Sequence, residues 1–284
     1  MTQPHTIFLR ELLEENPSLT DLAWIDEKLD HIVNQKDTLK LYLTYSLMAT
    51  TSAEKRILIE DINASELEYL DYQQADALQL SRVYLLASVL EADFGFFGPK
   101  VAQIIQVADR GELITFLKFL LLLPRAEYFK ETAVEALRTN ITPVFEAITM
   151  NNPYPSLHFN EQQWNQMYLK AAFMQLDLSQ IIGVEERANA QLARIISDYA
   201  HERWAASRDI DPMIWRPVSP YLNNDLMADM EKLLKSDRSS ENKAGALCCF
   251  HSASKEALEF LKSVAPDLYN QAKNNEISWN KIYD

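Results

Sequence analysis

Apolar residues recur along this chain at the three- and four-residue spacing of amphipathic helices, and no convincing series of alternating strands occurs. The spacing predicts helices over residues 6–15, 21–34, 37–50, 74–91, 97–109, 112–123, 126–141, 161–177, 186–207, 223–235, 240–251 and 254–263. Short connections between helices favour antiparallel neighbours. The sequence therefore predicts an all-α fold, a multi-helical array of antiparallel helix pairs, built either as a HEAT-like α-solenoid or as an irregular helical bundle.

Two closely spaced prolines mark the best candidate for a boundary inside the chain. In Asn152-Pro153-Tyr154-Pro155 each proline pushes the preceding residue out of the helical region, which predicts an extended connection. The segments on both sides are too apolar to stand alone. We expect a single all-helical domain, 1–284, with room for two lobes.

Composition limits the kind of partner. Lys plus Arg total 27 against 41 Asp plus Glu, a formal charge of −14, which argues against nucleic acid and against an anionic membrane surface. Five glycines leave little material for a phosphate-binding or dinucleotide loop. The longest apolar run, Leu113 to Leu123, is too short to cross a bilayer and contains Lys118, so we expect no transmembrane segment. Cys248 and Cys249 are adjacent and offer no disulfide framework, so we interpret them as buried small hydrophobes in a cytoplasmic protein.

The predicted helix 186–207 breaks the amphipathic rule. At 100° per residue, Arg203 falls on the core face, Glu202 at its edge, His201 on the opposite face and Trp204 on a flank. A guanidinium on a core face needs partners, so Arg203 is either a structural ion pair or a ligand for an anion or carbonyl group. His201-Glu202 resembles half of a zinc-binding helix, but the second histidine is missing because Ala205 stands at its position. We therefore expect no metal site and no cofactor.

Two other segments carry polar groups among apolar residues. Lys170 lies on a helix that is apolar nearly all round, where it could snorkel to the surface, pair, or act as a desolvated amine. Thr142-Pro143 is typical of a helix start, whereas Arg138 and Asn140 just before it have no comparable structural reason.

Three groups of motifs resemble one family. They are Glu135–Asn140 with Val144–Ile148 and Asn151–Pro155; Trp164-Asn165-Gln166-Met167 with Leu169-Lys170-Ala171; and Glu186–Asn189 with Leu192–Arg194, Asp198–Ala206 and Ile214-Trp215-Arg216. Together these segments resemble the EboA proteins over about residues 73–222, and the first 70 residues match only loosely. The pattern departs at Ser207, where we expect glycine after the paired alanines.

The resemblance implies a place in a bacterial gene cluster of several protein types. These include a UbiA-like membrane prenyltransferase, a TatD-like metal hydrolase, and proteins resembling dehydroquinate synthase and sugar-phosphate isomerases. In cyanobacteria the cluster is associated with making or exporting the precursor of the pigment scytonemin. The family has no settled biochemical activity. The implied partners are a small-molecule metabolite or other proteins of the cluster.

Three functional hypotheses follow. The chain is a non-catalytic helical protein that binds a prenylated or aromatic metabolite or a partner protein; or an enzyme of unknown reaction with an Arg/Lys/Glu/His pocket; or a purely structural helical protein. No Walker loop, nucleophile elbow or dinucleotide fingerprint favours the enzyme. The candidate ligand-binding residues are Arg138, Asn140, Trp164, Asn165, Gln166, Lys170, Arg187, Asn189, His201, Glu202, Arg203 and Trp204.

Overall fold

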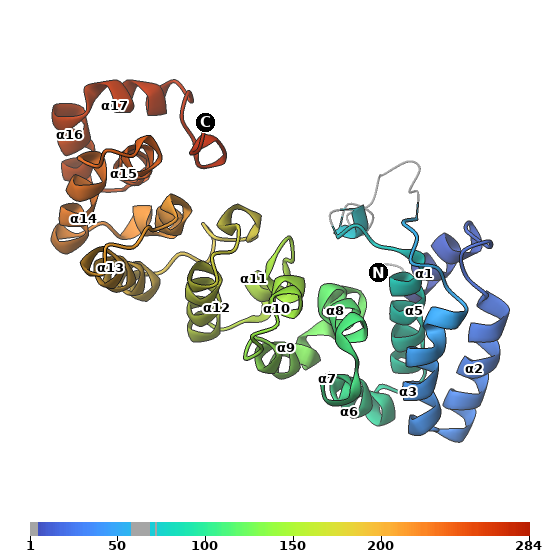
Figure 1. Cartoon of the computed structure of the whole chain (residues 1–284). Helices are drawn as coiled ribbons and strands as arrows, with labels where there is room; N and C mark the ends of the chain where they lie inside the picture. Colours follow the sequence, from blue (N-terminus) through green and yellow to red (C-terminus); the bar gives the residue numbers. More distant parts are fainter. Residues whose placement is uncertain (1–4, 58–68, 72) are drawn as a thin grey trace. The chain divides into compact units, whose positions relative to one another are not determined.

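The computed structural model describes residues 5–57, 69–71 and 73–284 (Figure 1). Throughout these residues the regular structure is helical and no β-strand occurs, so the predicted all-α class is confirmed. Two compact units form, residues 1–158 and residues 159–284. Within the described residues no helix is long and apolar enough to cross a membrane.

The first unit is built around one buried helix, α5. Its helices are α1 (His5–Glu14), α2 (Leu22–Gln35), α3 (Thr38–Leu47), α5 (Ala77–Ala92), α6 (Phe94–Ala102), α7 (Ile104–Val107), α8 (Arg110–Lys118), α9 (Lys130–Ala136), α10 (Thr142–Thr149) and α11 (Tyr154–His158), with short 3-10 turns at Met48–Thr50, Leu120–Leu122 and Ala126–Phe129. Twelve of the 16 residues of α5 are buried, because α1, α2, α6 and α8 all pack on it. A capping box between Asp76 and Gln79 begins this helix.

The second unit is built around α15 in the same way. Its elements are α12 (Glu161–Phe173), η4 (Leu178–Gln180), α13 (Ala190–Ala205), η5 (Pro212–Tyr221), α14 (Asn224–Leu234), α15 (Ser239–His251), α16 (Lys255–Val264), α17 (Pro266–Lys273) and η6 (Trp279–Lys281). Helix α15 packs against η5, α14, α16 and α17 (Figure 1). Cys248 and Cys249 lie in its buried centre with no exposed surface, as predicted. Burial raises the pKa of the Cys248 thiol and raises that of Cys249 to about 12, so both stay protonated and unreactive at neutral pH.

Several element boundaries differ from the sequence prediction. The segment around Pro155 is not extended throughout, because Tyr154–His158 forms a short helix whose first turn accommodates the proline ring. The predicted helix 186–207 begins only at Ala190, since Asn189 takes an extended conformation and caps it. Helix α8 ends at Lys118 rather than at residue 123, and the lysine Nζ donates to the Gln73 carbonyl 3.0 Å away.

Candidate functional site

The twelve candidate residues are divided between the two units. Arg138 and Asn140 belong to the first unit, just after α9, and both are exposed. The Arg138 side chain is 77% exposed and pairs with Glu135 at 2.7 Å, one turn earlier. The other ten residues belong to the second unit, on α12, on α13 and in the connection between them.

The N-terminal end of α13 is held by a pair of asparagines. The Asn189 side chain accepts a hydrogen bond from the Leu192 backbone N–H at 2.8 Å and so caps the helix. Asn165 on α12 and Asn189 also bond each other reciprocally, with N···O distances of 3.1 and 2.8 Å. Asn165 is 2% exposed, so these contacts satisfy its amide where water cannot. The pair fastens α12 to the start of α13.

Arg187 and Trp164 complete this end of α13. The Arg187 guanidinium lies 5.3 Å from the centroid of the buried Trp164 ring and donates to the Phe159 carbonyl at 2.7 Å. Partial desolvation lowers the pKa of Arg187. We call Trp164, Asn165, Arg187 and Asn189 the α12–α13 junction. Its amide and guanidinium groups bond within the second unit, which supports a structural role for them, whereas the buried Trp164 Nε1 has no hydrogen-bond partner among the described residues.

Gln166 and Lys170 lie further along α12. Gln166 is exposed, whereas Lys170 is half-buried and desolvation lowers its pKa. Both residues lie on α12 after the junction residues Trp164 and Asn165, and Lys170 lies one turn after Gln166.

The C-terminal half of α13 is tied to α14 through a buried carboxylate. Asp229 on α14 is 2% exposed, and its two oxygens accept from Ser197 Oγ at 2.5 Å and contact His201 Nε2 at 2.6 Å. Ser197 thus donates to the carboxylate rather than to the imidazole, so these groups do not have the hydrogen bonding of a nucleophilic triad. The arrangement instead fixes α13 against α14 and orients the imidazole.

Trp204 is the centre of an aromatic cluster one turn after His201. Its ring stacks on the fully buried Trp215 ring, with centroids 5.9 Å apart and an interplanar angle of 21°. The His201 ring lies 5.6 Å from it. Lys232 Nζ of α14 lies 4.0 Å from the centroid of the Trp204 ring. The indole is therefore held from three sides while remaining half-buried.

Arg203 closes the end of the helix. It is half-buried rather than enclosed, and its Nε and Nη2 donate to the Asp209 carbonyl at 3.1 and 2.5 Å. Its guanidinium also lies 5.9 Å from the Tyr199 ring. Of the two alternatives for Arg203, a structural role is the one these contacts support, although its partner is a backbone carbonyl and not an acid. Glu202 beside it is exposed.

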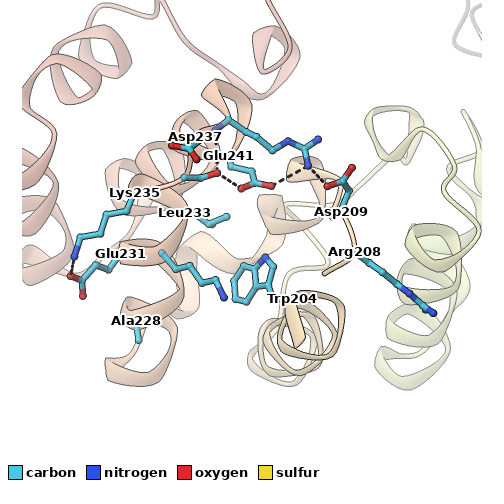
Figure 2. Close-up of a pocket in the computed structure, with 12 residues that line it drawn as sticks. Trp204, Arg208, Asp209, Ala228, Glu231, Leu233, Lys235, Asp237 and Glu241 are labelled. Atoms are coloured by element: carbon cyan, nitrogen blue, oxygen red, sulfur yellow. Dashed lines mark hydrogen bonds and ion pairs between the residues drawn. The ribbon is translucent and has the colours of Figure 1, made fainter. Parts of the chain in front are cut away.

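A hollow of about 620 Å³ opens beside Trp204, and we call it the Trp204 pocket (Figure 2). It is lined by Trp204, Arg208, Asp209, Ala228, Glu231, Lys232, Leu233, Lys235, Ser236, Asp237, Arg238 and Glu241. Figure 2 shows the Trp204 indole between the end of α13 and α14, with Arg208 directed away from it. A volume of this size suits a small organic molecule.

Most charges that line the pocket are neutralised by one another. Lys235 pairs with Glu231 one turn earlier. Arg238 pairs with Asp209 at 2.7 Å and with Glu241 at 3.5 Å. A second bond to Glu241 comes from Ser236 Oγ at 2.5 Å. At this end of the pocket the two carboxylates of Asp209 and Glu241 therefore share one guanidinium, which leaves a net negative charge.

Of the residues predicted from sequence, Trp204 lines this pocket, whereas the α14 and α15 residues opposite it were not predicted. Helix α14 has an ordinary amphipathic pattern with Leu226, Met230 and Leu233 buried, so its exposed charges read as solvated surface. The sequence signal for this pocket was a tryptophan beside the paired alanines Ala205 and Ala206, and it indicated only the α13 wall of the pocket.

The site offers no metal-ligand cluster. In the part of the chain that the structure describes, no group of three or more His, Cys, Asp and Glu side chains is arranged to hold a metal ion. The residues around Trp204 are suited to stacking, hydrogen bonding and charge pairing with a ligand.

The comparisons with known proteins identify a family. No curated protein and no solved structure matches the chain. A family model described as "Metabolite traffic protein EboA" matches residues 6–219, which is about three quarters of the chain. The match includes the N-terminal segment that resembled the family only loosely, and it ends before α14, so it contains Trp204 but not the opposite wall of the pocket. This chain belongs to the EboA family.

Proposed function

We propose that the chain binds a small, planar and largely apolar metabolite in the Trp204 pocket and carries it without changing it chemically. The observation that supports this most directly is the Trp204 indole, a half-buried ring backed by Trp215 at the edge of a hollow of about 620 Å³. A ring held in this way presents a preorganised stacking surface, which lowers the entropic cost of binding. The family description as a metabolite traffic protein agrees with carriage rather than conversion.

The finer role follows from the family resemblance. In this proposal the ligand is a prenylated or aromatic intermediate of a secondary-metabolite pathway such as the scytonemin type, and it is passed to another protein of the same cluster. The buried, unpaired thiols of Cys248 and Cys249 agree with work in the reducing cytoplasm.

Titration with a neutral aromatic dye tests the binding. N-phenylnaphthylamine becomes fluorescent when it leaves water, so its titration reports an apolar site directly. We expect saturable binding that Trp204→Ala weakens by about tenfold, because stacking is lost. Trp24→Ala is the matched control, since Trp24 is also half-buried beneath a lysine, with Lys28 Nζ 5.6 Å from its ring. Equal binding by wild type and Trp204→Ala would refute the proposal.

An enzyme acting on a pathway intermediate is the second candidate. His201 stands next to Trp204 and is oriented by the buried Asp229, which is how a general base is commonly supported. Under this alternative, Glu202→Gln or Lys170→Met would abolish formation of the pathway product in cells while leaving dye binding and the melting temperature unchanged. A carrier would retain product formation in both variants.

A further inference from the structure

Two cations that line the Trp204 pocket, Lys232 and Arg208, form no ion pair within the described part of the chain, and Lys232 is the one that lies on the tryptophan. Lys232 Nζ lies 4.0 Å from the Trp204 centroid, and within the described part of the chain no carboxylate forms an ion pair with it. A cation–π contact at an exposed site leaves most of the charge available to a stronger partner. The ammonium group is thus held at the stacking surface by a weak contact that a ligand can replace.

The other cations around the pocket are not available in this way. Lys235, one turn of α14 away, is paired with Glu231, and Arg238 is paired with both Asp209 and Glu241. The Arg208 side chain is directed away from Trp204 (Figure 2). Asp237 is the lining carboxylate that forms no ion pair among the described residues, and it lies beyond the end of α14 near Glu241 rather than beside the indole (Figure 2). Of the cations that line the pocket, Lys232 is therefore the one that lies at the stacking surface without an acidic partner among the described residues.

We infer that the Trp204 pocket selects an aromatic anion, with the ring system of the ligand on Trp204 and its carboxylate, sulfonate or phosphate group on Lys232. This inference rests on the function proposed above and adds the charge class of the ligand. Lysine has four rotatable side-chain bonds, so its ammonium can leave the ring face as the ligand's ring arrives and then pair with the anionic group. Lys232 then loses its cation–π contact and gains an ion pair. The ligand's ring takes the place of the ammonium on the face of Trp204.

The charge of the whole protein makes this local cation decisive. At −14 the chain repels anions at long range, although salt at physiological strength screens that repulsion beyond roughly 8 Å. A preference for an anion over a neutral molecule of the same shape therefore has to arise at short range. Lys232 is the residue placed to supply it.

A matched pair of dyes tests the inference. Anilinonaphthalene sulfonate and N-phenylnaphthylamine share one ring system and differ by a sulfonate, so the ratio of their dissociation constants measures charge selection. We expect wild type to bind the sulfonate about fivefold more tightly, the upper range for an exposed ion pair. Lys232→Met should reduce that ratio to about one by weakening the binding of the sulfonate, whereas the neutral dye, which displaces the lysine from the ring in wild type, should bind no more weakly than before.

Lys28→Met is the matched control, because it also removes one lysine that lies over a tryptophan and changes the net charge equally. It should preserve the ratio of the two dissociation constants.

Trp204→Ala identifies the fraction of each dye that binds in the pocket, and circular dichroism confirms that each variant is folded. Binding of both dyes with a ratio of one in wild type, or a ratio that survives Lys232→Met, would overturn the anion selection and leave the carrier function standing. Binding insensitive to Trp204→Ala would overturn both.

Discussion

The two ends of α13 use similar residues for different purposes. At its start, Asn189 and Asn165 bond each other, and Arg187 bonds the Phe159 carbonyl and lies over the fully buried Trp164 ring. At its end, Trp204 lies over a hollow with a lysine that has no acidic partner among the described residues. Closed polar contacts stabilise a fold, whereas an unmatched ring and charge at a cavity are available to a ligand. The same helix therefore carries a structural junction at one end and a candidate site at the other.

Breaking the junction should have the largest effect on stability. Asn189→Ala removes the helix cap and leaves the buried Asn165 amide without its reciprocal partner. We expect the free energy of unfolding to fall by about 3 kcal/mol, the sum of a lost cap and an unsatisfied buried amide. Urea denaturation measures it, with the exposed Gln166→Ala on α12 as the control. Dye affinity of the folded variant should be unchanged, and a loss of affinity would contradict the separation of the two ends.

A substitution at Asp229 should lower both the free energy of unfolding and the affinity for the dye. Asp229→Asn weakens the contacts to Ser197 and His201 that fix α14, the helix that carries Lys232, against α13. We expect a loss of about 2 kcal/mol in the free energy of unfolding, because one partner of charge-assisted, buried hydrogen bonds is replaced. Dye affinity should fall together with stability, unlike in Asn189→Ala. Unchanged affinity in Asp229→Asn would show that the pocket does not depend on this tie.

The comparison also explains how much could be predicted from sequence. Helical periodicity and local signals predicted the all-α class, and the capping box from Asn160 to Gln163 is present with bonds of 3.0 and 2.8 Å. These features depend on residues a few positions apart. The resemblance to the EboA family is confirmed by the family match over residues 6–219. The assignment of Trp204 and its neighbours to ligand binding stays a prediction.

The features that could not be predicted from sequence depend on contacts between helices, which hydrophobic periodicity does not encode. A helical projection gives the direction in which Arg203 points but not whether another element covers it, and Arg203 lies in the last turn of α13, where it is only half-buried. The Lys232 contact requires the packing of α14 beside α13, which joins residues 28 positions apart along the chain. Sequence therefore located one wall of the pocket, and tertiary packing supplied the other.

Arg203 gives a smaller test of the end of α13. Its two hydrogen bonds to the Asp209 carbonyl hold the turn that brings Asp209 to the pocket wall. Arg203→Leu should lower the free energy of unfolding by about 1 kcal/mol, since the group is partly solvated and water can replace part of the contact. Arg194→Leu is the control, because its side chain is 84% exposed on the same helix. A loss as large as that of Asn189→Ala would show that the end of α13 is as tightly built as its start.

Ser207→Gly should have the smallest effect, and it should stabilise the protein rather than destabilise it. After α13 the chain turns in a Schellman motif, with Ser207 N–H bonded to the Trp204 carbonyl at 3.0 Å and Arg208 N–H bonded to the Arg203 carbonyl at 2.9 Å. Ser207 has φ = 53°, in the left-handed region that favours glycine, which accounts physically for the glycine expected at this position. Ser207→Gly should raise the free energy of unfolding by roughly 0.5 kcal/mol, because relief of the side-chain strain exceeds the added freedom of the unfolded chain. Thermal unfolding measures the gain, with Ser207→Ala as the comparison that keeps the strain. The substitution leaves every lining residue of the Trp204 pocket in place, so altered dye binding in Ser207→Gly would mean that the pocket needs the strained turn.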